Sequence, residues 1–147
     1  MPDWFKDLKT FQLLMANTGI EGELPRWLSS AASIHMLDLS SNALTGELPS
    51  WIGSNMTQLA SLNLSGNALT GELPSWIGNM TQLYTLDLSN NGFNSSIPAE
   101  FNNLTHLIDL DLHSNKLSGP IPALMAAIPA SAFAGNPGLC GAPLPPC

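Results

Sequence analysis

Leucines recur along the chain in a pattern where two apolar positions are separated by one polar position. The pairs are Leu37/Leu39, Leu62/Leu64, Leu86/Leu88 and Leu110/Leu112. Because successive side chains of a strand point to opposite faces, each pair predicts a short strand with one buried face. The polar neighbours of these leucines are then expected on an exposed face.

Each leucine pair belongs to a longer repeat that ends in proline. Gly-Glu-Leu-Pro occurs at 22–25, 46–49 and 71–74, degenerate copies end at Pro98 and Pro122, and the prolines lie 24, 25, 24 and 24 residues apart. One such unit, LxxLxLxxNxLxGxLP, cannot bury its own leucines, whereas stacked units can. We therefore predict an α/β solenoid, a right-handed coil with a short parallel sheet on the concave side and an irregular or short-helical convex side. The one length irregularity is an extra residue around Ser54.

A polar residue stands seven positions before each repeat proline. These residues are Thr18, Asn42, Asn67, Asn91 and Asn115. We predict an internal ladder, in which each amide satisfies backbone groups of a tight turn, rather than a binding column. The first unit is irregular, because Leu8, Phe11 and Leu14 follow one phase while Thr18, Gly22 and Pro25 follow another, shifted by one residue.

The exposed strand positions are where a partner would make contact, since each unit presents one short row of side chains there. The candidate ligand-binding residues are Asp38, Asn63, Tyr84, Asp87, Asp109, Asp111 and His113. Three of the acids, Asp38, Asp87 and Asp111, are expected in one column, which would suit a ligand with Lys, Arg or a free amine. Leu-Asp-Leu-Ser is also the usual sequence of this repeat, so the alternative is that these aspartates have a purely structural role. Five strands make a face only about 20 Å across.

Charge excludes some partners. The chain has 11 Asp and Glu against 4 Lys and Arg, a net charge of -7, so it offers no basic surface for nucleic acid. No apolar run approaches the roughly 20 residues that span a bilayer. The start Met1-Pro2-Asp3-Trp4 is not that of a signal peptide.

The sequence contains no catalytic or metal-binding motif. His35, His106 and His113 lack metal-ligand spacing and are predicted to be surface residues. Asp109 and Asp111 form the one carboxylate pair of interest, but an open concave face is expected to provide no pocket around them. We predict a protein that is not an enzyme and that has no cofactor and no metal.

Two further patterns have structural interpretations. Cys140 and Cys147 flank a proline-containing loop, which predicts a disulfide, with free thiols as the alternative and a metal site disfavoured by the absence of histidine nearby. Tryptophans stand two residues after Pro2, Pro25, Pro49 and Pro74, at Trp4, Trp27, Trp51 and Trp76. We interpret this column as packing between units, and a contact stripe is the alternative.

Five Asn-x-Ser/Thr sequons are candidate glycosylation sites. They are Asn55, Asn63, Asn79, Asn94 and Asn103. Asn55, Asn79 and Asn103 recur once per unit on the predicted convex side, with Met56, Met80 and Leu104 turned inward. Asn63 lies on the strand face, so it is the least favourable of the five.

The repeat units resemble a known family. LDLSSNALTGELPSWIG (37–53), LNLSGNALTGELPSWIG (62–78) and LDLSNNGFNSSIPAEF (86–101) resemble the plant-type leucine-rich repeat. The ending SAFAGNPGLCGAPLPPC (131–147) resembles the C-terminal cap of plant receptor-like kinase and receptor-like protein ectodomains. The resemblance divides the chain into about five repeats, the first incomplete, at 1–128 and a cap with the cysteine pair at 129–147.

The resemblance implies an extracellular recognition module that binds a peptide, a protein partner or a co-receptor in plant defence or developmental signalling. The alternatives are a secreted inhibitor of a microbial cell-wall hydrolase, or a truncated receptor fragment with little activity of its own. Family members usually begin with a signal peptide and a cysteine-containing cap, whereas this chain starts within a repeat. We therefore expect an extracellular or cell-surface location as part of a longer receptor, and self-association through an uncapped edge formed by Phe5, Leu8 and Phe11.

Overall fold

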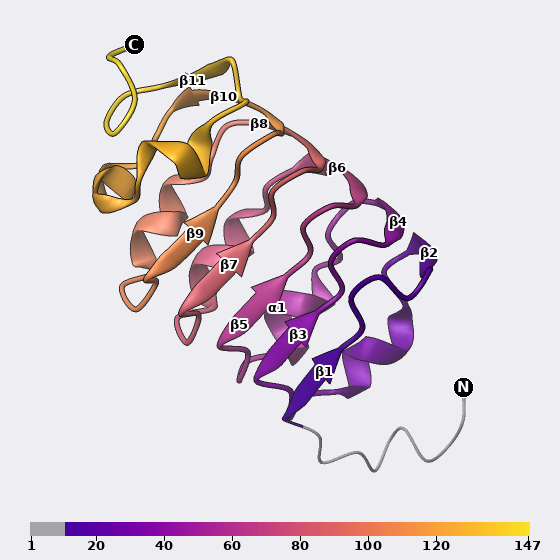
Figure 1. Ribbon diagram of the computed structural model, residues 1–147. Helices are drawn as coiled ribbons and strands as arrows, with labels where there is room; N and C mark the ends of the chain where they lie inside the picture. The colour runs from indigo at the N-terminus through magenta and orange to yellow at the C-terminus, as the bar shows by residue number, and fades with distance from the viewer. Residues whose placement is uncertain (1–10) are drawn as a thin grey trace.

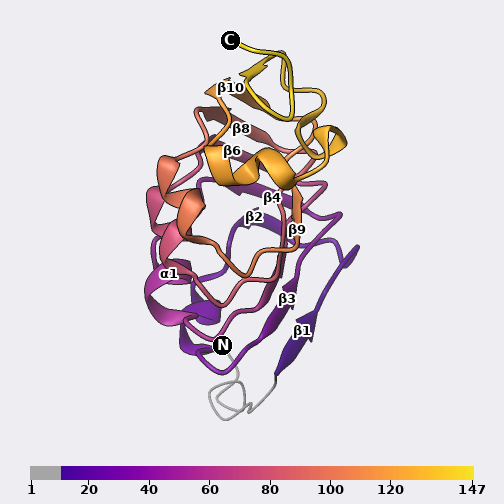
Figure 2. The same ribbon diagram turned by 90° about the vertical axis from the view of Figure 1, so that its left-hand side faces the viewer.

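The computed structural model describes residues 11–147, except the side chains of Leu124 and Ala126. Its coils stack side by side into a solenoid, with a five-stranded parallel sheet, a six-stranded parallel sheet and a column of short helices (Figure 1). Figure 2 shows the helices and the five-stranded sheet on opposite sides of the coil. The predicted α/β solenoid is confirmed. Trp4, Phe5 and Leu8 lie outside the described residues.

The five-stranded sheet follows the leucine pairs, and we call its outer side the concave face. Its strands are β1 (Gln12–Leu14), β3 (Met36–Asp38), β5 (Ser61–Asn63), β7 (Thr85–Asp87) and β9 (Asp109–Asp111), in this order. The register aligns the central leucines Leu13, Leu37, Leu62, Leu86 and Leu110 in one inward row. In the first unit the inward position is therefore Leu13, which agrees with the spacing from Thr18 and Pro25. Phe11 and Leu14, which follow the other spacing, point outward and are 62% and 60% exposed.

A second sheet lies on another side of the coil and was not predicted from the sequence. Its strands are β2 (Glu21–Glu23), β4 (Ala43–Gly46), β6 (Ala68–Glu72), β8 (Gly92–Ser95), β10 (Lys116–Pro120) and β11 (Gly138–Cys140). In β4 only Leu44 is buried, and Leu69, Phe93 and Leu117 occupy the same position in the next three strands. In these four strands the segment after the ladder residue thus alternates like the first strand, with one buried side chain in each, whereas all three residues of β2 are exposed.

Short helices form the convex side, as predicted. They are η2 (Arg26–Ser30), α1 (Trp51–Asn55), η3 (Ser75–Asn79), η4 (Ala99–Asn103) and η5 (Ala123–Ala127), all 3₁₀ helices except α1. A further 3₁₀ helix, η6 (Ala130–Phe133), lies instead beside β9 at the end of the five-stranded sheet. Proline precedes each 3₁₀ helix, and its carbonyl accepts the first hydrogen bond, as from Ile77 N to Pro74 O at 3.1 Å. The fixed φ of proline turns the chain at this point. None of the helices in the described part of the chain is long and apolar enough to cross a bilayer.

The extra residue near Ser54 is absorbed by a change of helix type. In α1 the amide of Met56 donates to Ile52 O, four residues earlier, at 3.2 Å. In η3 the equivalent amide of Met80 donates to Ile77 O, three residues earlier, at 2.9 Å. The wider α-turn accommodates one more residue, so that Met56 and Met80 are both buried.

The predicted asparagine ladder is present and connects adjacent coils. Asn67 Nδ2 donates to Leu39 O and Leu64 O at 3.0 Å each, while Oδ1 accepts the amide of Leu44 at 3.0 Å. The same arrangement recurs at Asn42, Asn91 and Asn115. Each amide side chain thereby satisfies carbonyls of two coils and one amide of the preceding coil.

The C-terminal residues continue the same architecture. Asn136 Nδ2 donates to Leu112 O at 2.9 Å and its Oδ1 accepts Leu117 N at 3.0 Å, which adds a rung that the sequence analysis did not identify. Phe133 is completely buried, and β11 pairs in parallel with β10. Cys140 and Cys147 form the predicted disulfide.

Candidate binding surface

Three of the four acidic residues of the concave face share one row of the sheet. The register aligns Leu14, Asp38, Asn63, Asp87 and Asp111 across the five strands. Asp109 lies in the neighbouring row with Thr85 and Ser61. The alternation of the strands therefore places the predicted residues as expected, on the side opposite the buried leucines.

These acids also hold the turn that follows each strand. Asp87 Oδ1 accepts hydrogen bonds from Ser89 N at 3.0 Å and Ser89 Oγ at 2.7 Å, and Asp38 does the same with Ser40. Asn63 makes the same two bonds to Ser65. An amide oxygen is thus sufficient for the turn, and the negative charge at the other positions is not required by the fold.

The second carboxylate oxygen is available to a partner. Within residues 11–147, Oδ2 of Asp38, Asp87 and Asp111 accepts no hydrogen bond from the protein. Asp111 Oδ1 accepts from His113 N at 3.0 Å and lies 2.6 Å from His113 Nδ1. His113, one of the predicted binding residues, therefore sits directly beside the last acid of the row.

An apolar row runs parallel to the acidic row, at the residue before each strand. It consists of Phe11, His35, Ala60, Tyr84 and Ile108, joined by backbone hydrogen bonds from each residue to the one in the preceding coil. Tyr84 is 49% exposed and Ile108 is 76% exposed. The rings of Phe11 and His35 are tilted against each other with centroids 5.3 Å apart, and the ring centroids of Tyr84 and His106 are 6.1 Å apart. Of these five residues, Tyr84 was predicted to bind a ligand and His35 was predicted to lie at the surface, whereas the row itself was not predicted from the sequence.

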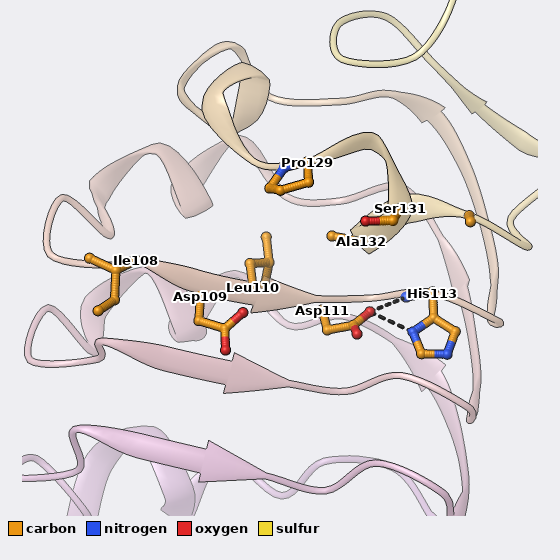
Figure 3. A pocket seen from close by; sticks show the side chains of 9 residues that line it. Ile108, Asp109, Leu110, Asp111, His113, Pro129, Ser131 and Ala132 are labelled. Atoms are coloured by element: carbon orange, nitrogen blue, oxygen red, sulfur yellow. Dashed lines mark hydrogen bonds and ion pairs between the residues drawn. The ribbon is translucent and has the colours of Figure 1, made fainter.

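The face ends in a hollow of about 450 Å³ that was not expected on an open sheet. It lies between β9 and the chain segment Pro129–Ala134 (Figure 3). Its lining residues are Ile108, Asp109, Leu110, Asp111, His113, Pro129, Ser131, Ala132 and Ala134. Three predicted binding residues, Asp109, Asp111 and His113, thus stand in a concave site.

The hollow forms because the last segment covers only half of the sheet edge. Leu112 N donates to Ala132 O and Ser114 N donates to Ala134 O, both at 2.8 Å, so this segment follows β9 from Leu112 onward. β9 is the last strand of the sheet. Beside Asp109–Asp111 the segment diverges, and the space between the two becomes the hollow (Figure 3).

The tryptophans are not part of this surface. Trp27, Trp51 and Trp76 are partly buried and pack against the hydrophobic core. A Cβ atom added to Gly53 would lie 2.6 Å from Cε3 of Trp76, so the indole of one coil lies directly on the glycine of the preceding coil. The interpretation of this column as packing between units is confirmed for Trp76, and Trp27 and Trp51 pack against the core.

The sequons lie on different faces. Asn55, Asn79 and Asn103 end the convex helices α1, η3 and η4 and are exposed, with Met56, Met80 and Leu104 buried as predicted. Asn94 is exposed on β8. Asn63 is half-buried in the acidic row, where its Oδ1 holds the turn.

The histidines do not form a metal centre. His35 Nδ1 lies 2.9 Å from Ser33 O, and His106 Nδ1 lies 3.1 Å from Thr81 O. Across residues 11–147, no group of three His, Cys, Asp or Glu side chains is placed to hold a metal ion.

Comparison with known proteins identifies the repeat. A family model described as leucine rich repeat matches residues 32–93 and 57–117. No curated protein sequence matches the chain. Among solved structures, the BIR2 ectodomain from Arabidopsis thaliana is 37% identical with a TM-score of 0.88, and the match covers 90% of this chain and 70% of that one.

Two further structures from the same plant are similar. A chain of the BIR3–SERK2 complex is 41% identical with a TM-score of 0.88, over 92% of this chain and 72% of that one. A chain of the complex of the receptor kinase HAESA with the peptide hormone IDA and the co-receptor SERK1 is 41% identical with a TM-score of 0.84, over 95% of this chain and 23% of that one. The chain therefore belongs to the leucine-rich repeat family and has the fold of plant receptor-kinase ectodomains.

Proposed function

We propose that the chain is an extracellular recognition module that binds a peptide or protein partner on its concave face, as part of a plant receptor in defence or developmental signalling. The observation that carries the proposal is the acidic row. Its turn function needs only an oxygen, as Asn63 demonstrates, yet three of the four polar positions carry a charge with one unused carboxylate oxygen. Such charges favour a partner with basic groups.

The apolar row supports the same proposal. Exposed Tyr84 and Ile108 stand beside the acids, so the face combines apolar contact area with charge. Interfaces commonly pair an aromatic or aliphatic centre with polar surroundings. The similar HAESA structure contains a peptide hormone and a co-receptor, which are the two kinds of partner proposed for this chain.

Catalysis is not part of the proposed function. Asp109 and Asp111 are the carboxylate pair singled out in the sequence, and Asp111 is already engaged with His113 N and Nδ1. Asp109 is exposed on the rim of the hollow. An exposed carboxylate beside one that holds a turn fits charge recognition better than general acid and base chemistry, which needs a site that excludes water.

We also propose that the N-terminal edge of the sheet can pair with a second copy. In the described part of the chain β1 is the edge strand, and Phe11 and Leu14 are both more than half exposed beside it. Light scattering at rising concentration would show association that falls when Phe11 and Leu14 are changed to serine. Unchanged association in that variant would rule this edge out.

A binding panel tests the main proposal. The purified chain is titrated against peptide hormones and co-receptor ectodomains, beginning with the IDA peptide and the SERK1 ectodomain, by calorimetry. We expect a partner whose affinity falls about tenfold in the variant Asp38→Asn with Asp87→Asn, because asparagine keeps the turn and removes the charge.

The matched control removes two charges elsewhere. Glu47→Gln with Glu72→Gln changes two exposed glutamates near the second sheet by the same total charge. Affinity should stay within about twofold of the unaltered chain. A panel in which no member binds, or a partner that responds equally to both variants, would contradict recognition by the acidic row. A partner that proves to be a microbial cell-wall hydrolase inhibited by the chain would favour the inhibitor function instead.

A further inference from the structure

The hollow at the end of the concave face has two unlike walls. One wall consists of Asp109 and Asp111 of β9 and the exposed Ile108 directly before this strand, and the segment after η5 supplies Pro129 and Ser131 on the other wall (Figure 3). Its volume of about 450 Å³ lies at the lower end of the usual range for sites that take a small ligand or a single side chain. The occupant must therefore be small, partly apolar and able to meet two acids.

The charged side chains that line the hollow are mainly acidic. Its lining contains no lysine or arginine, and the one basic group, His113, already lies 2.6 Å from Asp111. Asp109 is exposed, and within residues 11–147 its carboxylate makes no hydrogen bond. A positively charged group entering the hollow would meet Asp109 and the unused oxygen of Asp111 with no competing cation from lysine or arginine.

The geometry of the two acids favours a planar group with several donors. Asp109 and Asp111 project from the same side of β9, while Leu110 between them points the other way (Figure 3). Alternate residues of a strand are about 6.6 Å apart. A guanidinium presents five N–H donors in a flat fork and can reach two such carboxylates, whereas an ammonium is a point charge.

The apolar wall suits the remainder of such a side chain. Ile108 is 76% exposed and Pro129 lies on the opposite side of the hollow. An arginine has a stem of three methylene groups that is commonly buried against apolar surface while its head stays near charge. We propose that the hollow binds an arginine side chain of the partner, with the guanidinium between Asp109 and Asp111 and the stem between Ile108 and Pro129.

This inference rests on the proposed function and specifies it, since it names the residue type that the concave face recognises at its C-terminal end. We therefore expect the partner to place an arginine over β9 and the residues next to that arginine over β7. Tyr84, the residue directly before β7, is the neighbour of Ile108 in the apolar row, since Ile108 N donates to Tyr84 O at 2.9 Å. Because Tyr84 is exposed, it is the next residue that the partner would contact.

A short peptide with one charge tests the hollow. The probe is acetyl-Gly-Ala-Arg-Ala-Gly-amide, and matched peptides carry citrulline or lysine in place of arginine. Titrations of the isotope-labelled chain are followed by the backbone amide signals in NMR. We expect saturable shifts at 108–113 and 130–134 with the arginine peptide, and binding at least about tenfold weaker with citrulline, which has the same shape without the charge.

Two variants of the chain complete the experiment. Asp109→Asn with Asp111→Asn should weaken the arginine peptide about tenfold, and Asn63 shows that an asparagine at the position of Asp111 can hold the turn. Glu47→Gln with Glu72→Gln loses the same charge away from the hollow and should leave the affinity within about twofold. The dispersed amide spectrum of each variant verifies its fold.

Several results would overturn the inference. These are equal binding of the citrulline peptide, shifts that fall outside the hollow, equal weakening by both variants, or a lysine peptide as tight as the arginine peptide. The calorimetric panel is independent of this readout. A partner that depends on Asp38 and Asp87 while the arginine peptide leaves 108–113 unshifted would refute the arginine site and leave the proposed function standing.

Discussion

Each ladder asparagine solves a problem that the tight turn creates. The turn leaves carbonyls such as Leu39 O and Leu64 O inside the coil without strand partners, and the amide of Asn67 reaches both. The same side chain accepts Leu44 N, so a single residue satisfies groups of two coils. Buried backbone groups without partners are costly, and this explains why the residue recurs once per unit.

Replacement of a ladder asparagine should therefore destabilise the fold. We expect Asn67→Ala to lower the free energy of unfolding by about 3 kcal/mol, because it leaves buried backbone groups without partners. Urea unfolding followed by circular dichroism measures the change. Asn79→Ala is the control, since Asn79 is exposed at the end of η3, and it should change stability by about 0.5 kcal/mol or less. Equal effects of the two substitutions would show that the ladder does not stabilise the stack.

At the scale of single elements, the chain adjusts helix type to conserve burial. Unit length rises by one residue near Ser54, yet Ile52 and Met56 remain fully buried as Ile77 and Met80 do in the next unit. The turn changes from 3₁₀ to α and the strands on either side keep their register. Packing of the inward side chains therefore determines the element, and the local hydrogen bonding follows.

Deletion of Ser54 tests this adjustment. The shortened segment would read Trp-Ile-Gly-Asn-Met-Thr, as at 76–81, and should form a 3₁₀ turn with a stability change of about 1 kcal/mol or less. Deletion of Asn79 makes a unit shorter than any of the four units between repeat prolines, and it should cost more than about 3 kcal/mol by displacing Met80 from the core. Thermal unfolding of the two variants compares them. Equal losses would contradict the view that the unit tolerates the extra residue by changing helix type.

Much of this architecture was predictable because it depends on alternation. The leucine pairs determine which side chains of the first strand face outward, so the acidic row followed directly from Asp38, Asp87 and Asp111. The second sheet was missed because its strands carry at most one buried residue each, such as Leu44, among small and polar neighbours that are typical of turns. An Asp-x-Ser spacing could have indicated the turn bonds of the acidic row.

The hollow and the last ladder rung could not be derived from the repeat. Asn136 follows Asn115 by 21 residues, which breaks the period of the earlier rungs. The path of Pro129–Ala134 depends on the burial of Phe133 and on bonds to Leu112 and Ser114, and no periodic pattern in the sequence specifies these contacts. Tertiary contacts outside a repeat carry too little local signal to be predicted from a single sequence.

At the scale of the whole molecule, the proposed partner-binding residues and most of the candidate glycosylation sites lie on different faces. The concave face carries the acidic and apolar rows, whereas Asn55, Asn79 and Asn103 are exposed on the convex helices and Asn94 is exposed on β8. Glycans at these positions would leave the concave face uncovered. A glycan on Asn63 would stand within the acidic row, where the side-chain oxygen already accepts two bonds from Ser65.

Expression through a plant secretory pathway tests this division. We expect glycopeptide mass spectrometry to find glycans at the convex asparagines and at Asn94, with Asn63 unmodified, because Asn63 is half-buried within the sheet whereas the other four are exposed. The substitution Asn63→Asp, which keeps the turn acceptor, should leave the glycoform masses otherwise unchanged. A glycan on Asn63 at an occupancy similar to the others would contradict a concave face reserved for a partner.

The most direct test of the account is the footprint of a bound partner. Amide hydrogen exchange is measured on the chain alone and with the tightest binder from the calorimetric panel. We expect slower exchange in peptides that cover β3, β5, β7 and β9 and the segment 129–134, with unchanged exchange in the convex helices η2, α1, η3 and η4. Protection confined to those helices or to the second sheet would contradict recognition by the concave face.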